Sequence, residues 1–201
     1  MGTRRTTGMT APGPDRTTAS RAAAIAEQLQ YECSILLELY RERESFTEVL
    51  VDDGHLVSIS PPSSQSDPKD KLWRVHSALL QCHVLLERAI AREEEELGTG
   101  KKAEYETQRK KVNDRLSLIL MTTEDLLKAV DGSSVQTPSG QGSELNGPTT
   151  LFELKLWVYR ILQEIEYWTK MAVTTFRELS PLIAKDQART TRVKGLRSAQ
   201  R

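Results

Sequence analysis

Four long helical patterns, separated by gaps of unequal length, constrain the fold of this chain more than any other feature. Apolar residues recur every three or four positions in residues 18–45, 68–96 and 101–130, and again from about residue 151 onward. Nothing between these patterns alternates with period two over enough residues to predict a strand. The sequence therefore predicts an all-α protein.

The lengths of the gaps restrict the topology. The gaps cover about residues 46–67, 97–100 and 131–149, so they are long, short and long. A helix of about 27 residues is roughly 40 Å long, and an extended chain covers at most about 3.5 Å per residue. Both long gaps are therefore able to travel the height of a bundle, whereas the short gap forces antiparallel neighbours. This spacing favours a four-helix bundle with up-up-down-down topology and two long crossover loops, although an up-down-up-down bundle with two loose loops stays open.

Each predicted helix has an apolar stripe, and the ends carry residues typical of helix termini. The first stripe contains Ala22, Ile25, Leu29, Cys33, Leu36 and Tyr40; the second Leu72, Val75, Leu79, Cys82 and Leu86; the third Val112, Leu116, Ile119, Thr123 and Leu126. The expected caps and ends are Asp67 with Pro68, Asp131 with Gly132, and Thr149 or Thr150 with Glu153.

The fourth helical pattern predicts two different faces. Its core stripe consists of Leu154, Val158, Ile161, Ile165, Trp168, Ala172 and Phe176. Phe152 and Lys155 are neighbours on the helix surface and lie roughly 160° and 100° from the centre of this stripe, with Tyr159 beside them. We expect all three to point outward. An exposed phenylalanine next to a cation is typical of an interface anchor.

Length and charge indicate one domain without an overall electrostatic attraction to a polyanion. The 201 residues, with 28 basic and 28 acidic side chains, predict a bundle over residues 18–184 between disordered segments 1–17 and 185–201. The net charge of zero predicts no nucleic-acid partner, and no apolar run predicts stable membrane insertion. The basic segment 185–201 is interpreted as a solubilising tail, with binding of heparan-type glycans as the alternative.

The sequence contains no motif that predicts an enzyme or a cofactor. A Gly-rich phosphate loop, HExxH, Cys-x-x-Cys and Gly-x-Ser-x-Gly are all missing. His76 and His83 lack an obvious third metal ligand, and Cys33 and Cys82 are expected to be buried free thiols, with a disulfide as the alternative. The acidic run 93–96 opposes the local helix dipole, and we expect attraction to the lysines at 101 and 102 to compensate.

Several segments resemble the ciliary neurotrophic factor family. The resemblance is carried by Leu151-Phe152-Glu153-x-Lys155-Leu156-Trp157, Leu162-Gln163-Glu164 and Trp168-Thr169 in the fourth helix, by His83-Val84-Leu85-Leu86 with Arg88 in the second, and by Ser20-Arg21 and Tyr40 in the first. It covers most of residues 18–187. It implies a cytokine that is monomeric before it meets its receptors.

The resemblance also implies partners and site residues. Phe152 and Lys155, with Tyr159 beside them, would bind the leukaemia inhibitory factor receptor. Lys170 and Arg177 would bind a non-signalling alpha receptor, and the faces of the first and third helices would bind a shared glycoprotein signalling receptor. Receptor assembly would then activate JAK-STAT signalling.

Two features differ from the family pattern, and one rival function stays open. Glu27 and Gln30 stand where the mammalian pattern has basic residues, and the family's tryptophan near Ser63 is missing. No secretory signal is recognisable, so we expect cytoplasmic synthesis followed by non-conventional release. The alternative is an intracellular helical-bundle adaptor that binds another protein through the Phe152 surface.

Overall fold

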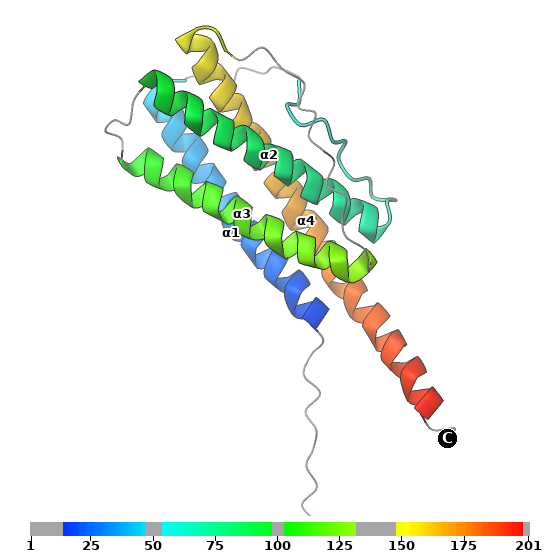
Figure 1. Ribbon diagram of the computed structural model, residues 1–201. Helices are drawn as coiled ribbons and strands as arrows, with labels where there is room; N and C mark the ends of the chain where they lie inside the picture. The colour runs from blue at the N-terminus through cyan, green and yellow to red at the C-terminus, as the bar shows by residue number, and fades with distance from the viewer. Residues whose placement is uncertain (1–13, 47–53, 98–102, 132–147, 199–201) are drawn as a thin grey trace, which may run out of the picture.

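The computed structural model describes residues 14–46, 54–97, 103–131 and 148–198, and the description below concerns these residues. They form four helices and no strand: α1 (Pro14–Glu44), α2 (Pro68–Leu97), α3 (Ala103–Asp131) and α4 (Leu151–Ser198). Figure 1 shows the four helices side by side in one bundle. The prediction of an all-α four-helix bundle is confirmed.

Polar contacts show that α1 runs antiparallel to α4. Near the middle of α1, Arg177 Nη2 lies 2.8 Å from Glu27 Oε1. Near its end, the Tyr40 hydroxyl donates a hydrogen bond of 2.9 Å to the backbone oxygen of Lys155. The contacts therefore move towards the start of α4 as they move towards the end of α1, so the two helices are antiparallel.

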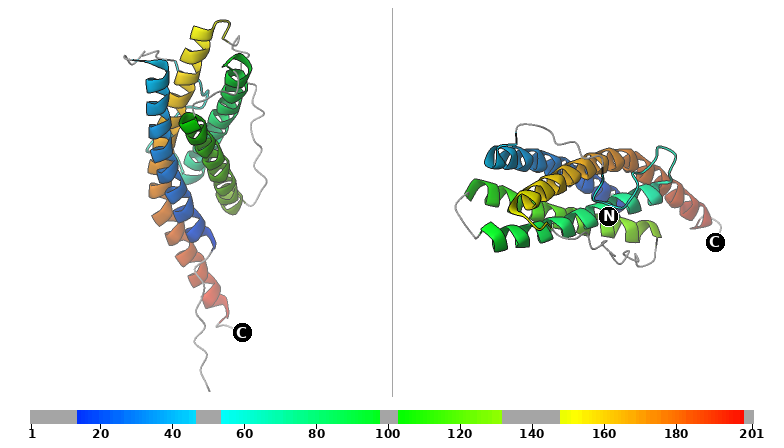
Figure 2. Two further views of the ribbon diagram at one scale, coloured as in Figure 1. Left: turned by 90° about the vertical axis from the view of Figure 1, so that its left-hand side faces the viewer. Right: turned by 90° about the horizontal axis from the view of Figure 1, so that it is seen from above.

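The same comparison shows that α2 runs antiparallel to α3. His76 Nδ1 lies 2.7 Å from Thr123 Oγ1, and Arg109 Nη1 lies 2.7 Å from Glu93 Oε2. Both α1 and α2 pack against both α3 and α4. α2 also runs antiparallel to α4, because Lys71 Nζ lies 2.9 Å from Glu178 Oε2 while Arg92, later on α2, donates to the backbone oxygen of Pro148 just before α4 at 3.4 Å. Since α1 and α2 are both antiparallel to α4, they are parallel to each other, and the bundle has the predicted up-up-down-down topology (Figure 2).

The predicted cap of α2 is confirmed, whereas α1 starts at Pro14, four residues before the predicted Thr18, and Gly132 lies outside the described residues. The Asp67 carboxylate accepts a hydrogen bond of 2.9 Å from the backbone N–H of Asp70, so it caps α2 ahead of Pro68. At the end of α1, the N–H of Phe46 donates to the backbone oxygen of Arg41 at 3.1 Å. Ser45 adopts a positive φ of 56°, which completes a Schellman-type C-cap.

The core contains the predicted stripes of all four helices. Among its largest fully buried side chains are Trp168, Tyr40, Phe176, Leu29, Leu79 and Leu116. Cys33 and Cys82 are both buried and free, so the thiol interpretation is confirmed and the disulfide is excluded.

The C-terminal segment differs from its prediction. The sequence predicts a disordered segment over residues 185–201, whereas α4 continues to Ser198 and projects beyond the other helices (Figure 1). The reason is local, because this segment is rich in residues that favour helices and contains no proline after Pro181. The predicted N-terminal segment 1–17 overlaps the start of α1 at Pro14, and residues 1–13 lie outside the described part.

Candidate binding surface

A capping box fixes the first turn of α4. The Glu153 carboxylate accepts hydrogen bonds from the backbone N–H groups of Thr149 and Thr150 at 2.8 and 3.1 Å, and from the Thr149 hydroxyl at 2.7 Å. In return, the Thr150 hydroxyl accepts from the N–H of Glu153 at 3.2 Å. The hydrogen bond from the Thr149 side chain and those from the backbone lower the pKa of Glu153. The backbone of this turn is therefore fixed by local hydrogen bonds.

Phe152 projects from this turn into solvent. Its side chain is 64% exposed, and the adjacent Leu151 is 49% exposed. Of the five large hydrophobic residues that are exposed in the described part of the chain, these two are neighbours. The first turn of α4, in yellow in Figures 1 and 2, extends past the end of α1, so no helix covers it. The predicted outward direction of Phe152 is confirmed.

Lys155 lies one turn further along α4 and is held in place. Its Nζ atom forms an ion pair of 2.7 Å with Glu44 at the end of α1, and its backbone oxygen accepts the hydrogen bond from Tyr40. The side chain stays 32% exposed while Glu44 is almost completely buried. The ammonium group is thus fixed at the edge of the bundle, next to the exposed Phe152.

Tyr159 is buried, so the prediction that it points outward was wrong. Its side chain is 1% exposed, its hydroxyl accepts a hydrogen bond of 3.0 Å from Arg41 Nε, and its ring lies 5.1 Å from that of Phe46. The periodicity argument allowed one buried stripe, but α4 packs against both α1 and α2 and therefore buries a wider arc. Phe152 is exposed because it lies in the first turn of α4, two turns before Tyr159, and this turn extends past the end of α1.

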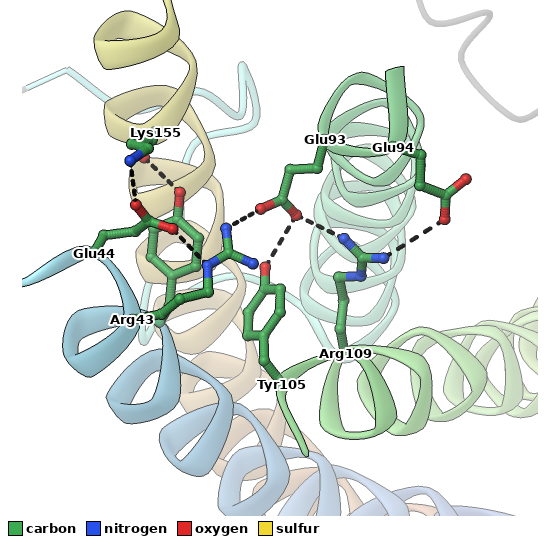
Figure 3. A network of polar contacts seen from close by, with 8 residues as sticks. Arg43, Glu44, Glu93, Glu94, Tyr105, Arg109 and Lys155 are labelled. Carbon is green, nitrogen blue, oxygen red and sulfur yellow. Dashed lines mark hydrogen bonds and ion pairs between the residues drawn. The ribbon is translucent and has the colours of Figure 1, made fainter. Parts of the chain in front are cut away.

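Below Lys155, a chain of ionic contacts joins all four helices (Figure 3). Glu44 accepts from Arg43 Nε at 2.5 Å, and Arg43 Nη2 pairs with Glu93 of α2. Glu93 in turn pairs with Arg109 of α3 at 2.7 Å and accepts a hydrogen bond of 3.1 Å from the Tyr105 hydroxyl. We call Arg43, Glu44, Glu93, Tyr105, Arg109 and Lys155 the four-helix ionic network.

The electrostatics of the network follow from burial and pairing. Burial alone would raise the pKa of Glu44, but hydrogen bonds from Lys155 and Arg43 lower it below its ordinary value. Burial would likewise lower the pKa of Arg43, but the Glu93 carboxylate raises it overall. The Arg43 guanidinium also lies 4.1 Å from the centroid of the Tyr105 ring, a cation–π distance. Glu44 and Arg43 are therefore both favoured in their charged forms, and the network links the base of the Phe152 surface to each helix.

Sequence reasoning missed the network, although Glu93 gave a signal. Glu93 continues the apolar stripe of α2 four residues after Ala89, and a carboxylate on such a stripe needs a buried partner. The expected compensation from the lysines at 101 and 102 lies outside the described residues; within them, Arg43 and Arg109 pair with Glu93.

Lys170 and Arg177 form a separate exposed region on the later part of α4. Lys170 is paired with Glu166 at 3.0 Å, and Arg177 is paired with Glu27 of α1. Both are exposed, as predicted. Because Lys170 lies 15 residues after Lys155, at about 1.5 Å per residue, the two regions are roughly 22 Å apart. The structure thus presents two distinct surfaces on one helix.

The histidines have hydrogen-bonding partners on neighbouring segments. His76 bonds to Thr123, and burial lowers its pKa; His83 Nε2 lies 3.1 Å from the Ser117 hydroxyl. In the described part of the chain, no group of three or more His, Cys, Asp or Glu side chains has the arrangement of a metal site. The described helices also include none that is long and apolar enough to cross a membrane.

The chain is similar to a known protein family. The sequence model of the family described as ciliary neurotrophic factor matches residues 6–196, which is nearly the whole chain. A search of curated proteins gives no match.

Proposed function

The chain belongs to the ciliary neurotrophic factor family of cytokines, and from this we propose that it signals by assembling receptor chains at the cell surface. The family is a class of neurotrophic factors and not of enzymes. We propose the leukaemia inhibitory factor receptor as the partner of the Phe152 surface. The signal would be JAK-STAT signalling, started by receptor-bound JAK kinases that are brought together on the cytoplasmic side.

One observation carries this proposal: Phe152 is exposed on a rigid, capped turn beside an ordered cation. A large aromatic side chain that enters a desolvated receptor pocket contributes about 2 kcal/mol or more to binding. Its direction is already fixed by the Thr150–Glu153 capping box, and Lys155 is already ordered by Glu44. The entropy lost on binding is therefore small, which favours affinity.

Two further receptor contacts are proposed on other faces. We propose that the exposed faces of α1 and α3 bind the shared glycoprotein signalling receptor. We propose that Lys170 and Arg177 bind the alpha receptor. Their separation from Phe152 along α4 supports simultaneous binding, because two receptor chains on surfaces about 22 Å apart do not compete for the same residues. Bivalent binding would then increase the stability of the complex on the membrane.

The test is the substitution Phe152→Ala, measured by surface plasmon resonance on the receptor ectodomain. A loss of about 2 kcal/mol corresponds to a roughly thirtyfold change in affinity, because 1.4 kcal/mol is a factor of ten. We therefore expect the affinity of Phe152→Ala for the leukaemia inhibitory factor receptor to fall by at least about thirtyfold. The free energy of unfolding should change by no more than about 0.5 kcal/mol, because the side chain is exposed. The matched control is Met121→Ala on α3, which removes another side chain that is about two-thirds exposed.

Cell assays separate this proposal from the adaptor alternative. Added from outside, the purified protein should raise STAT phosphorylation in cells that carry the receptors, and Phe152→Ala should not. If the protein has no effect from outside and binds no receptor ectodomain, the receptor proposal is wrong. Loss of an intracellular partner on Phe152→Ala would then support the adaptor function.

A further inference from the structure

A second buried carboxylate, Glu164, lies on α4 away from the ionic network. Its side chain is about 8% exposed, and it accepts a hydrogen bond of 2.9 Å from the Trp168 indole N–H through Oε1. Its two oxygens lie 3.2 and 3.3 Å from His55 Nδ1, and Oε2 accepts a hydrogen bond of 3.4 Å from the backbone N–H of Leu56. One side chain of α4 therefore binds both the core of the bundle and the first crossover.

The crossover segment 54–61 is attached around this point. Arg160 donates a hydrogen bond of 3.0 Å to the backbone oxygen of Gly54, and Gln81 of α2 accepts from the N–H of Ser58 at 3.0 Å. Val57 is buried in the core cluster. The segment is thus held against the bundle by several contacts, and Glu164 is the buried group to which His55 and Leu56 bond.

This attachment places the crossover beside the exposed cations of α4. The His55 ring lies 5.2 Å from the ring of Tyr167. Lys170 follows Tyr167 by three residues, and Arg177 follows Lys170 by seven, so these side chains share one side of the helix. His55, Tyr167, Lys170 and Arg177 therefore lie along the same side of α4, and we call these four residues the crossover surface.

We propose that Glu164 is a positioning residue, which fixes the crossover segment against α4 so that the crossover surface acts as a single binding site for the alpha receptor. The inference rests on the proposed function, because it takes the alpha receptor as the partner of Lys170 and Arg177. Glu164 itself is buried and does not touch that partner. It acts through His55 and Leu56.

The substitution Glu164→Gln separates positioning from core support. The amide oxygen of glutamine still accepts from the buried Trp168 N–H, but its NH₂ group then faces the N–H of Leu56, which is also a donor. The crossover loses its attachment through Glu164, while its contacts with Arg160 and Gln81 and the hydrogen bond to Trp168 in the core remain. We expect the melting temperature to change little, and hydrogen exchange at the Leu56 amide to become about tenfold faster.

Binding to two receptor ectodomains then tests the role. We expect the affinity of Glu164→Gln for the alpha receptor to fall about tenfold, because a released segment must be ordered on binding. Its affinity for the leukaemia inhibitory factor receptor should stay within about twofold, since Phe152 lies in the first turn of α4, away from the crossover segment. Adding His55→Ala to Glu164→Gln should cause no further loss, because both changes remove the same attachment.

A matched control and three outcomes decide the matter. Glu124→Gln on α3 removes an exposed carboxylate whose ion pair is with Lys128, and it should alter neither affinity. Unchanged exchange at Leu56, or unchanged alpha-receptor affinity despite faster exchange, would overturn the positioning role. If the unmodified protein fails to bind the alpha receptor but binds the leukaemia inhibitory factor receptor, the assigned partner is wrong, while the exchange measurement still shows whether Glu164 fixes the segment.

Discussion

Replacing Glu93 by glutamine should destabilise the bundle far more than the same change at Glu94. The two residues are adjacent on α2, but their surroundings differ. The Glu93 side chain is 5% exposed and pairs with Arg43 and Arg109, whereas that of Glu94 is 50% exposed and lies 3.6 Å from Arg109 Nη2. Glutamine preserves the size and shape of the side chain, so the comparison isolates the charge.

The expected magnitudes follow from burial. Removing one partner of a buried ion pair leaves a charge without compensation and costs about 3–5 kcal/mol. Here the guanidinium groups of Arg43 and Arg109 are 14% and 10% exposed, so neither is able to recover full hydration. A solvent-exposed ion pair contributes only about 0–1 kcal/mol. We therefore expect losses of about 3 kcal/mol for Glu93→Gln and under about 1 kcal/mol for Glu94→Gln.

Urea denaturation followed by circular dichroism at pH 7 measures both values. At a slope of about 2 kcal/mol per molar urea, Glu93→Gln should lower the midpoint by about 1.5 M, with an unchanged slope. Equal and small shifts for the two variants would refute the reasoning, because they would mean that water reaches the network and screens its charges. A larger effect at Glu94 would contradict the assignment of Glu93 as the central carboxylate.

Three other perturbations test different parts of the structure. Ser45→Gly should stabilise the protein by about 0.5–1 kcal/mol in the same urea assay, because glycine adopts the positive φ at this C-cap without strain, whereas Ser34→Gly within α1 should destabilise it. The pairing of Glu44 lowers its pKa, so its contribution to stability is complete above the unfolded-state pKa of about 4.3 and is lost as pH falls through the folded-state value. The difference in urea midpoint between the wild type and Glu44→Gln should therefore shrink between pH 7 and pH 3. A constant difference would contradict the ionic role. Burial raises the pKa of the Cys33 thiol to about 12 and that of Cys82 well above its ordinary value. Neither thiol should therefore react rapidly with Ellman's reagent at pH 8 until guanidinium unfolds the chain. Rapid labelling of the native protein would show that the core opens easily.

The sequence by itself determined the helices, their order and the inner face of each one. Periodicity identified the stripes because each helix buries the same side along its length, as the complete burial of Leu29, Leu79 and Leu116 shows. Local chemistry identified the caps at Asp67 and Thr150, since a capping side chain bonds to its own segment. The gap lengths predicted the topology for a geometric reason, because a short connection is unable to span the bundle. The exposed Phe152 was predictable for the same local reasons.

Only the tertiary structure decided which polar residues lie inside and where the exposed arc of α4 ends. Tyr159 is buried because the end of α1, with Phe46, covers it, and the periodicity of one helix contains no information about that neighbour. Glu93 lies on the apolar stripe of α2 and Glu164 at the margin of the stripe of α4, and the sequence did not identify a partner for either of these buried carboxylates. Those partners, Arg43 and His55, lie 50 and 109 residues away along the chain. Contacts over such separations form only when the helices pack, and burial in the packed interior is what makes these carboxylates important.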